Sequence, residues 1–192
     1  MILASASPRR KELLEHAGFE LTIVPADVDE TRQPDEKPID LVARLATLKA
    51  HACLKSFGTL TPGETLLGAD TIVWLEDDVL GKPRDDADAM RMLHELSGKT
   101  HHVSTGVCLL MGGSHHVEER VFVETSHVTF RVLTDEEIRA YVATGEPLDK
   151  AGSYAIQGGA QSFVEQLDGD YDNVVGLPVT RVLRELESAQ LS

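Results

Sequence analysis

The first half of the chain alternates short apolar runs with amphipathic helical patterns. Residues 2–4 and 21–24 are typical of short strands, and residues 66–75 form a longer apolar run, consistent with a strand buried on both faces. Ser7-Pro8 follows the first run, and serine is a favourable helix N-cap while proline is a favourable first helical residue. A second helix, capped by Asp40, is predicted because leucine and alanine recur after it at helical spacing.

The middle of the chain breaks this alternation. A third helix fits residues 85–96, and residues 102–111 and 119–132 have the Val, Thr and Phe content of two consecutive strands. Thr134 and Glu137 have the spacing of a capping box that opens a fourth helix. Residues 151–178 are Gly-rich and irregular, and a final amphipathic helix follows them. The pattern predicts an α/β fold with a mixed twisted sheet and flanking helices, rather than a purely parallel sheet.

Length and composition fit a globular chain. The 192 residues are 42% hydrophobic and 26% charged, which is enough apolar material for a substantial core. We expect a single domain over residues 1–192, with any second lobe built from the middle strands at about residues 84–145.

The charge balance and the cysteines limit the partners and the compartment. Eighteen basic against 32 acidic residues give a net charge of −14, which disfavours binding to nucleic acid or to an anionic membrane. The two cysteines, Cys53 and Cys108, have no metal-ligand spacing and predict a reducing compartment, the cytoplasm. A small local basic patch would still suit a ligand that carries phosphates.

Such a patch occupies the first turn of the first predicted helix. Arg9, Arg10 and Lys11 stand where the helix macrodipole is already positive, and each cation there costs ~0.3–1 kcal/mol. Free N–H groups, the two serines Ser5 and Ser7 and three cations together suit a multiply charged anion such as a polyphosphate. The alternative interpretation is a solvated basic turn.

Asp70 is the only charged residue within the apolar run 66–75. An ionised carboxylate in a buried strand is costly unless it is paired, hydrogen-bonded or bound to a metal. One interpretation is a structural ion pair, and the other is a carboxylate that holds Mg²⁺ or activates water. Glu30, in an acidic loop, is a candidate second metal carboxylate, although such loops are often only solvated.

Three lysines are candidates for neutralising a polyphosphate. Lys49 lies beside the apolar stripe of the second predicted helix, where a snorkelling lysine is the alternative interpretation. Lys82 precedes Pro83, which fixes the direction of its loop, and Lys150 precedes the Gly-rich segment. The pairs His101-His102 and His115-His116 lack zinc-binding spacing, and we expect them at strand ends or on the surface.

With these residues in hand, the sequence resembles the Maf family of nucleoside triphosphate pyrophosphatases. The matching strings occur in the family's order along nearly the whole chain: Ser5-Ala6-Ser7-Pro8-Arg9-Arg10, Asp29-Glu30, Lys49-Ala50, Gly68-Ala69-Asp70-Thr71-Ile72-Val73, Gly81-Lys82-Pro83, Leu96-Ser97-Gly98, Asp149-Lys150-Ala151-Gly152-Ser153-Tyr154-Ala155-Ile156-Gln157-Gly158 and Asn173-Val174-Val175-Gly176-Leu177-Pro178.

The resemblance implies an elongated, two-lobed inosine-triphosphatase-like architecture with the active site in a central cleft. It implies hydrolysis of the bond between the α- and β-phosphates of a nucleoside triphosphate, with a divalent cation, Mg²⁺ or Mn²⁺. The aspartate that matches Asp70 is the proposed general base in such proteins. Residues around the phosphates and the metal match Ser7, Arg10, Glu30, Lys49 and Lys82. Homodimers are common among similar proteins.

Substrate choice divides this family. Members that act on dTTP and UTP resemble this chain at Pro8-Arg9, Asp70-Thr71 and the glutamine Gln157, whose amide offers a donor and an acceptor to a pyrimidine edge. Members that favour 7-methyl-GTP differ at the glutamine segment. Three alternatives stay open: a 7-methyl-GTP pyrophosphatase, a nucleotide-binding regulator of cell division and septum formation, and a phosphomonoesterase.

Overall fold

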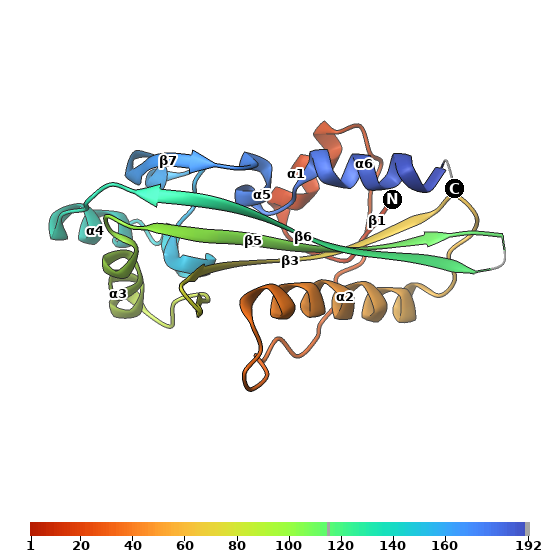
Figure 1. Cartoon of the computed structure of the whole chain (residues 1–192), viewed down its shortest axis with the longest axis horizontal. Helices are drawn as coiled ribbons and strands as arrows, with labels where there is room; N and C mark the ends of the chain where they lie inside the picture. The colour runs from red at the N-terminus through yellow and green to blue at the C-terminus, as the bar shows by residue number, and fades with distance from the viewer. Residues whose placement is uncertain (115, 191–192) are drawn as a thin grey trace. The chain divides into compact units, whose positions relative to one another are not determined.

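A seven-stranded mixed sheet is the framework of the computed structural model, which describes residues 1–114 and 116–190 (Figure 1). The strands are β1 (Ile2–Leu3), β2 (Thr22–Ile23), β3 (Thr65–Leu75), β4 (Asp78–Leu80), β5 (Thr100–Gly112), β6 (Val117–Phe130) and β7 (Val164–Asp168). Their order is β2-β1-β3-β5-β6-β7, and β4 pairs with β3. Because β1 is parallel to β2 and β3 while β4 and β7 are antiparallel to their neighbours, the prediction of a mixed sheet is confirmed.

The helices begin where the sequence supplies a start signal. They are α1 (Pro8–His16), α2 (Pro38–Phe57), α3 (Asp86–Leu96), α4 (Asp135–Val142), α5 (Tyr171–Val175) and α6 (Val179–Gln190). Ser7 caps α1 by accepting the backbone N–H of Arg10, and Thr134 with Glu137 forms the predicted capping box of α4. Among the described residues, no helix is both long enough and apolar enough to cross a membrane.

Two element predictions were wrong. Asp40 does not cap α2, because Pro38 suits the first helical position and starts the helix three residues earlier than predicted, after Lys37. Residues 151–178 are more ordered than their glycines indicated. They contain β7, α5 and two 3-10 helices, η2 (Ala151–Ser153) and η3 (Gly159–Phe163), and a further 3-10 helix, η1 (Glu146–Asp149), precedes them.

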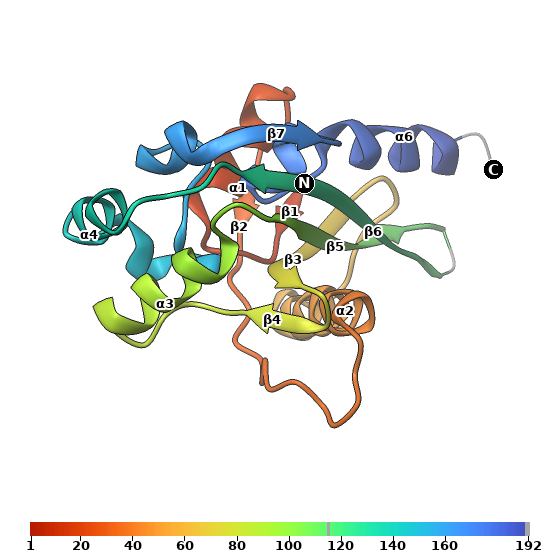
Figure 2. The same cartoon turned by 60° about the vertical axis from the view of Figure 1, so that its left-hand side comes forward.

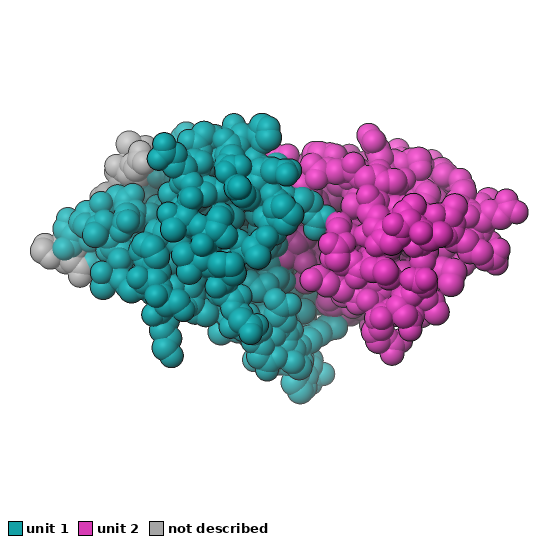
Figure 3. Space-filling model, turned by 180° about the vertical axis from the view of Figure 1, so that it is seen from behind, with its two compact units in different colours: residues 1–70, 105–124, 176–192 teal, residues 71–104, 125–175 magenta. Residues whose placement is uncertain are grey.

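The chain forms two compact units, drawn in different colours in Figure 3. The first comprises Met1–Asp70, Thr105–Glu124 and the chain from Gly176 onward, and the second comprises Thr71–Ser104 and Thr125–Val175. That they are lobes of one domain, with the second lobe at about residues 84–145, stays a prediction.

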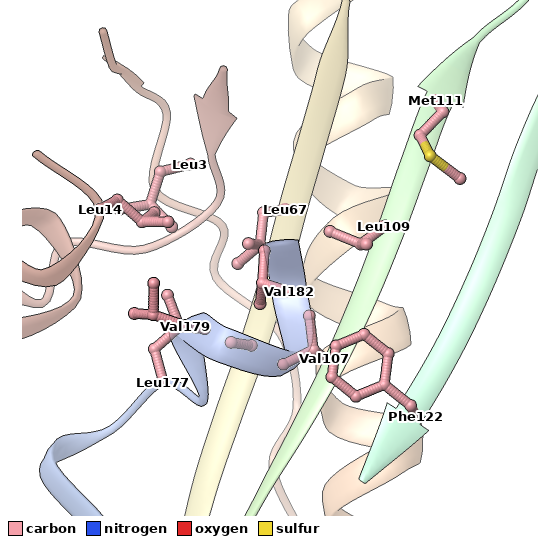
Figure 4. Packing of buried hydrophobic residues seen from close by; sticks show 11 residues of the cluster. Leu3, Leu14, Leu67, Val107, Leu109, Met111, Phe122, Leu177, Val179 and Val182 are labelled. Atoms are coloured by element: carbon pink, nitrogen blue, oxygen red, sulfur yellow. The ribbon is translucent and has the colours of Figure 1, made fainter. Parts of the chain in front are cut away.

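The first unit has apolar layers on both faces of its strands. Side chains alternate along a strand, so Leu67 faces α1 and α6, whereas Leu66 faces α2 (Figure 1). Figure 4 shows the α1–α6 layer, in which Leu14, Val179 and Val182 pack near Leu67. These two layers hold α1 and α2 against opposite faces of the same strands.

Helix α2 approaches the strands of this unit so closely that glycine is required beneath it. A Cβ at Gly68 would lie 2.5 Å from the carbonyl oxygen of Ala46, and one at Gly106 would lie 2.4 Å from that of Val42. Real Cβ atoms do not approach a backbone oxygen this closely. The two glycines therefore set the height of α2 above the sheet.

The second unit is built around aromatic side chains. In it β7 runs antiparallel beside β6 (Figure 2), and edge-to-face contacts join Phe130 to His101, Tyr154 and Phe163. His101 lies at the start of β5, as the strand-end prediction has it, but it is not on the surface: it is 0% exposed, and a 2.9 Å hydrogen bond joins its Nε2 and the hydroxyl of Tyr154. Of the second histidine pair, His115 lies outside the described residues.

Candidate functional site

The start of α1 is the basic turn that the sequence singles out. The hydroxyl oxygen of Ser7 accepts the backbone N–H of Arg10 at 3.5 Å, and the hydroxyl of Ser5 accepts Nη1 of Arg10 at 3.3 Å. Nε of Arg10 donates to the carbonyl oxygen of Gly176 at 2.9 Å. No acidic residue stands in this first turn, so the positive end of the helix keeps its charge.

The Arg10 guanidinium interacts with two carboxylates and with a second arginine. Burial lowers the pKa of its guanidinium, Asp70 and Glu30 oppose that change, and Arg9 adds to it. Arginine stays charged in proteins, so this half-buried side chain keeps its positive charge. Its electrostatic partners therefore include two residues that the sequence proposed as metal carboxylates.

Lys49 connects those two carboxylates. Its ammonium lies 2.6 Å from Oδ1 of Asp70 and 2.6 Å from Oε1 of Glu30. The side chain of Lys49 is only 12% exposed, so it does not snorkel into solvent as the alternative interpretation proposed. Asp70 is 9% exposed and has the ion pair that a buried carboxylate needs.

The register of α2 over β3 produces this contact. Gly68, two residues before Asp70, lets the backbone of Ala46 and Ala50 approach β3, and Lys49 lies on the turn of helix between them. A larger residue at position 68 would lift the helix and withdraw the ammonium from the carboxylate.

Glu30 and Asp70 supply two carboxylate ligands for Mg²⁺ or Mn²⁺, which is fewer than a site made of protein groups alone would need. Glu30 and Asp70 turn an oxygen toward the same cationic atom, Nζ of Lys49, so their carboxylates are close enough to share a cation. Among the described residues, no group of three or more His, Cys, Asp or Glu side chains is arranged to hold a metal. Magnesium is commonly held by one or two carboxylates together with water and substrate phosphates, and this pair matches that requirement.

Four other predicted residues belong to the second unit. Lys82 is exposed, and the carbonyl oxygen of the preceding Gly81 accepts the backbone N–H of Gly152 at 3.1 Å. Lys150 is paired with the carboxylate of its neighbour Asp149. Gln157 is exposed on a turn, and Thr71 is half-buried on β3.

The structure thus brings together one part of the predicted set. Ser7 with Arg10, and Lys49 with Glu30 and Asp70, are joined by direct contacts within the first unit. The place of Thr71, Lys82 and Gln157 in the same site stays a prediction. Sequence reasoning missed the role of Ser5 and of the Gly176 carbonyl, which together direct the Arg10 guanidinium. The repeated serine of Ser5-Ala6-Ser7 was the available signal for the first.

A family model described as "Maf-like protein" matches residues 1–189. The chain belongs to the Maf family. The predicted family membership is confirmed.

Curated relatives cover nearly the full length of this Maf protein. The protein named "dTTP/UTP pyrophosphatase" from Citrifermentans bemidjiense is 49% identical over 188 residues, which are 97% of this chain and 93% of the relative. A protein of the same name from Bacillus cereus strain AH820 is 50% identical over 187 residues, which are 97% of this chain and 94% of the relative.

A solved structure supports the fold class. The Staphylococcus aureus Ham1 protein superimposes on this Maf chain with a TM-score of 0.53 at 13% identity, over 98% of each chain. At this identity the similarity concerns the fold alone, and it confirms the predicted α/β class.

Proposed function

We propose that this Maf protein hydrolyses the anhydride bond between the α- and β-phosphates of dTTP and UTP, releasing the monophosphate and pyrophosphate. Relatives at about half identity over nearly the whole chain carry the name dTTP/UTP pyrophosphatase. The single observation that carries the chemistry is the pairing of Asp70 and Glu30 with one ammonium, that of Lys49, close to the cationic start of α1. A nucleotide-clearing role in metabolism follows from this reaction.

The basic turn of α1 binds the triphosphate in this proposal. The hydroxyl of Ser7, the free N–H groups of the first turn and the guanidinium of Arg10 supply donors and positive charge to phosphate oxygens. Arg9 adds charge at the same helix end. Lys82 is assigned to the leaving pyrophosphate, on which negative charge increases as the bond breaks.

Asp70 serves as the general base. Lys49 holds its Oδ1, and we assign Oδ2 to the water that attacks the anhydride. One water proton passes to this carboxylate, the water oxygen bonds to the α-phosphorus, the bond from that phosphorus to the bridging oxygen breaks, and pyrophosphate leaves with the bridging oxygen. A Mg²⁺ or Mn²⁺ ion held by Glu30 and Asp70 would neutralise phosphate charge when bound. Lys49 fixes the spacing of these two carboxylates in its absence.

Residues of the second unit set the base preference. Gln157 offers an amide N–H and carbonyl oxygen to the edge of a pyrimidine, and its exposure makes both available. Thr71 follows the general base directly and is assigned to substrate binding, together with Ser7, Arg9, Arg10 and Gln157. The support for these assignments is the match of their strings to the dTTP/UTP type within the family.

A pyrophosphate-release screen tests the proposal. Purified protein would be incubated with dTTP, UTP, CTP, GTP and 7-methyl-GTP, each with Mg²⁺ and with Mn²⁺. We expect pyrophosphate from dTTP and UTP. Turnover of 7-methyl-GTP alone would show that the subfamily assignment is wrong, release of orthophosphate would identify a phosphomonoesterase, and nucleotide binding without release would identify a regulator.

The proposal also covers the cellular compartment, the partners and the oligomeric state. Cys53 and Cys108 are free and buried, as suits a reducing cytoplasm, where nucleoside triphosphates are available. The net charge of −14 supports a protein that does not bind nucleic acid or anionic membrane. We include a homodimer in the proposal, to be tested by the molar mass in solution.

A further inference from the structure

Gln157 lies in a turn that is closed by a backbone hydrogen bond. The N–H of Gly158 donates to the carbonyl oxygen of Ala155 at 3.0 Å, and η3 begins at the next residue, Gly159. Within the described part of the chain, the exposed side chain of Gln157 makes no hydrogen bond or ion pair that would fix its direction. The direction of Gln157 is therefore set by whatever holds the backbone on either side of it.

Glu146 holds the backbone on the C-terminal side. Its Oε2 accepts the N–H of Gly159 at 3.0 Å. The carboxylate also lies so close to the turn that a Cβ at Gly158 would be 2.0 Å from Oε1. The Glu146 carboxylate is thus in contact with the backbone of both residues that follow Gln157.

Tyr141 holds the backbone on the N-terminal side. Its hydroxyl oxygen accepts the N–H of Ala155 at 3.1 Å, and its hydroxyl proton is hydrogen-bonded to the carboxylate of Glu146. A Cβ at Gly159 would lie 3.0 Å from the tyrosine ring. The anchors before and after Gln157 are thus joined to each other, and all of them belong to the second unit.

We propose that Glu146, acting with Tyr141, is a positioning residue that fixes the turn carrying Gln157 and thereby sets the pyrimidine preference of the enzyme. This inference rests on the proposed function and adds to it a residue that touches neither the phosphates nor the reacting water. Its carboxylate works as an acceptor for backbone N–H and tyrosine O–H, so a neutral acceptor of the same size supports the same turn.

Hydrogen exchange in the nucleotide-free protein tests the anchor itself. Glu146→Ala is expected to speed exchange of the backbone amides of residues 155–159 by about tenfold or more, whereas Glu146→Gln stays within about twofold of the parent. Gly158→Ala is expected to speed exchange alone but to add nothing in a Glu146→Ala background, because the atom that its Cβ meets is gone. Glu136→Ala, at an exposed position of α4, is the matched control.

Steady-state kinetics test the consequence. In Glu146→Ala we expect KM for dTTP and UTP to rise about tenfold, kcat to change little, and the preference over CTP and 7-methyl-GTP to shrink, with Glu146→Gln restoring it. Unchanged exchange in Glu146→Ala overturns the proposal whatever the enzyme hydrolyses. Faster exchange with unchanged nucleotide preference overturns the link to specificity. A parent protein that releases no pyrophosphate instead overturns the proposed function, and the exchange experiment still decides the anchor.

Discussion

Lys49 and Asp70 stand 21 positions apart in the sequence, and the ammonium of the lysine donates to Oδ1 of the aspartate at 2.6 Å. The same ammonium contacts Glu30, so one cation bridges the carboxylate of a loop residue and that of Asp70 in the middle of β3. The ion pair offsets the free-energy cost of burying the Asp70 carboxylate. It also keeps this carboxylate ionised, as a general base must be. Structural and catalytic interpretations of Asp70 are therefore compatible.

Asp70→Asn is expected to abolish pyrophosphate release, by at least ~100-fold in kcat, because an amide cannot accept the water proton. The side chain keeps its size and can still accept a hydrogen bond from Lys49, so the fold is expected to persist. Circular dichroism and thermal unfolding of the same sample check this. Activity within a few-fold of the parent would remove Asp70 from the role of base.

Lys49→Met is expected to destabilise the protein by about 1–3 kcal/mol, because Asp70 and Glu30 are then left facing each other without their cation. Mg²⁺ is expected to recover part of this loss, since a bound divalent ion stabilises the folded state that holds it. The measurement is thermal unfolding with and without MgCl₂. Lys11→Met, which removes an exposed lysine, is the control, and an equal response to Mg²⁺ in both variants would argue against the carboxylate pair as a cation site.

Gly68→Ala is expected to lower both stability and activity, because the added Cβ would lie 2.5 Å from the carbonyl oxygen of Ala46 and must displace α2. Overpacking of this kind typically costs about 1–3 kcal/mol, and we expect the free energy of unfolding to fall by about this amount. Gly81→Ala, whose Cβ meets nothing within 4 Å, serves as the stability control in urea unfolding. Equal unfolding midpoints for the two variants would contradict a tight α2–β3 contact.

His101 is expected to make the protein acid-sensitive. Burial, with a smaller contribution from the neighbouring His102, lowers its pKa from 6.5 to about 3. As pH falls below 6.5 the unfolded chain takes up a proton that the folded chain refuses, so stability falls by roughly 1.4 kcal/mol per pH unit until about pH 3. Above pH 6.5 this contribution to pH dependence vanishes.

His101→Phe is expected to flatten the stability profile between pH 6.5 and 4 relative to the parent, as measured by urea unfolding at each pH. His94→Gln, which replaces an exposed histidine on α3, should leave the slope as it is in the parent. A parental slope that persists in His101→Phe would assign the acid sensitivity to other groups.

Some features of the candidate site could be predicted from neighbouring residues in the sequence, and others could not. Ser7 and Pro8 predicted the start of α1, and the misplaced arginines that follow predicted an anion site, because both arguments need only neighbouring residues and the helix dipole. The lone charge at Asp70 was equally visible, since burial of the surrounding run follows from its composition. Its partner was not visible, because the register of α2 over β3 depends on the close approach at Gly68.

The sequence by itself determined the family, the α/β class, the starts of α1 and α4 and the identity of the charged residues, because these depend on order, periodicity and capping along the chain. The tertiary structure decided which side chains meet. Lys49 between Glu30 and Asp70, Arg10 on the Gly176 carbonyl and His101 in an aromatic core are contacts between distant segments. Packing fixes such contacts, because backbone clearances of a few tenths of an ångström decide the register of each helix on the sheet.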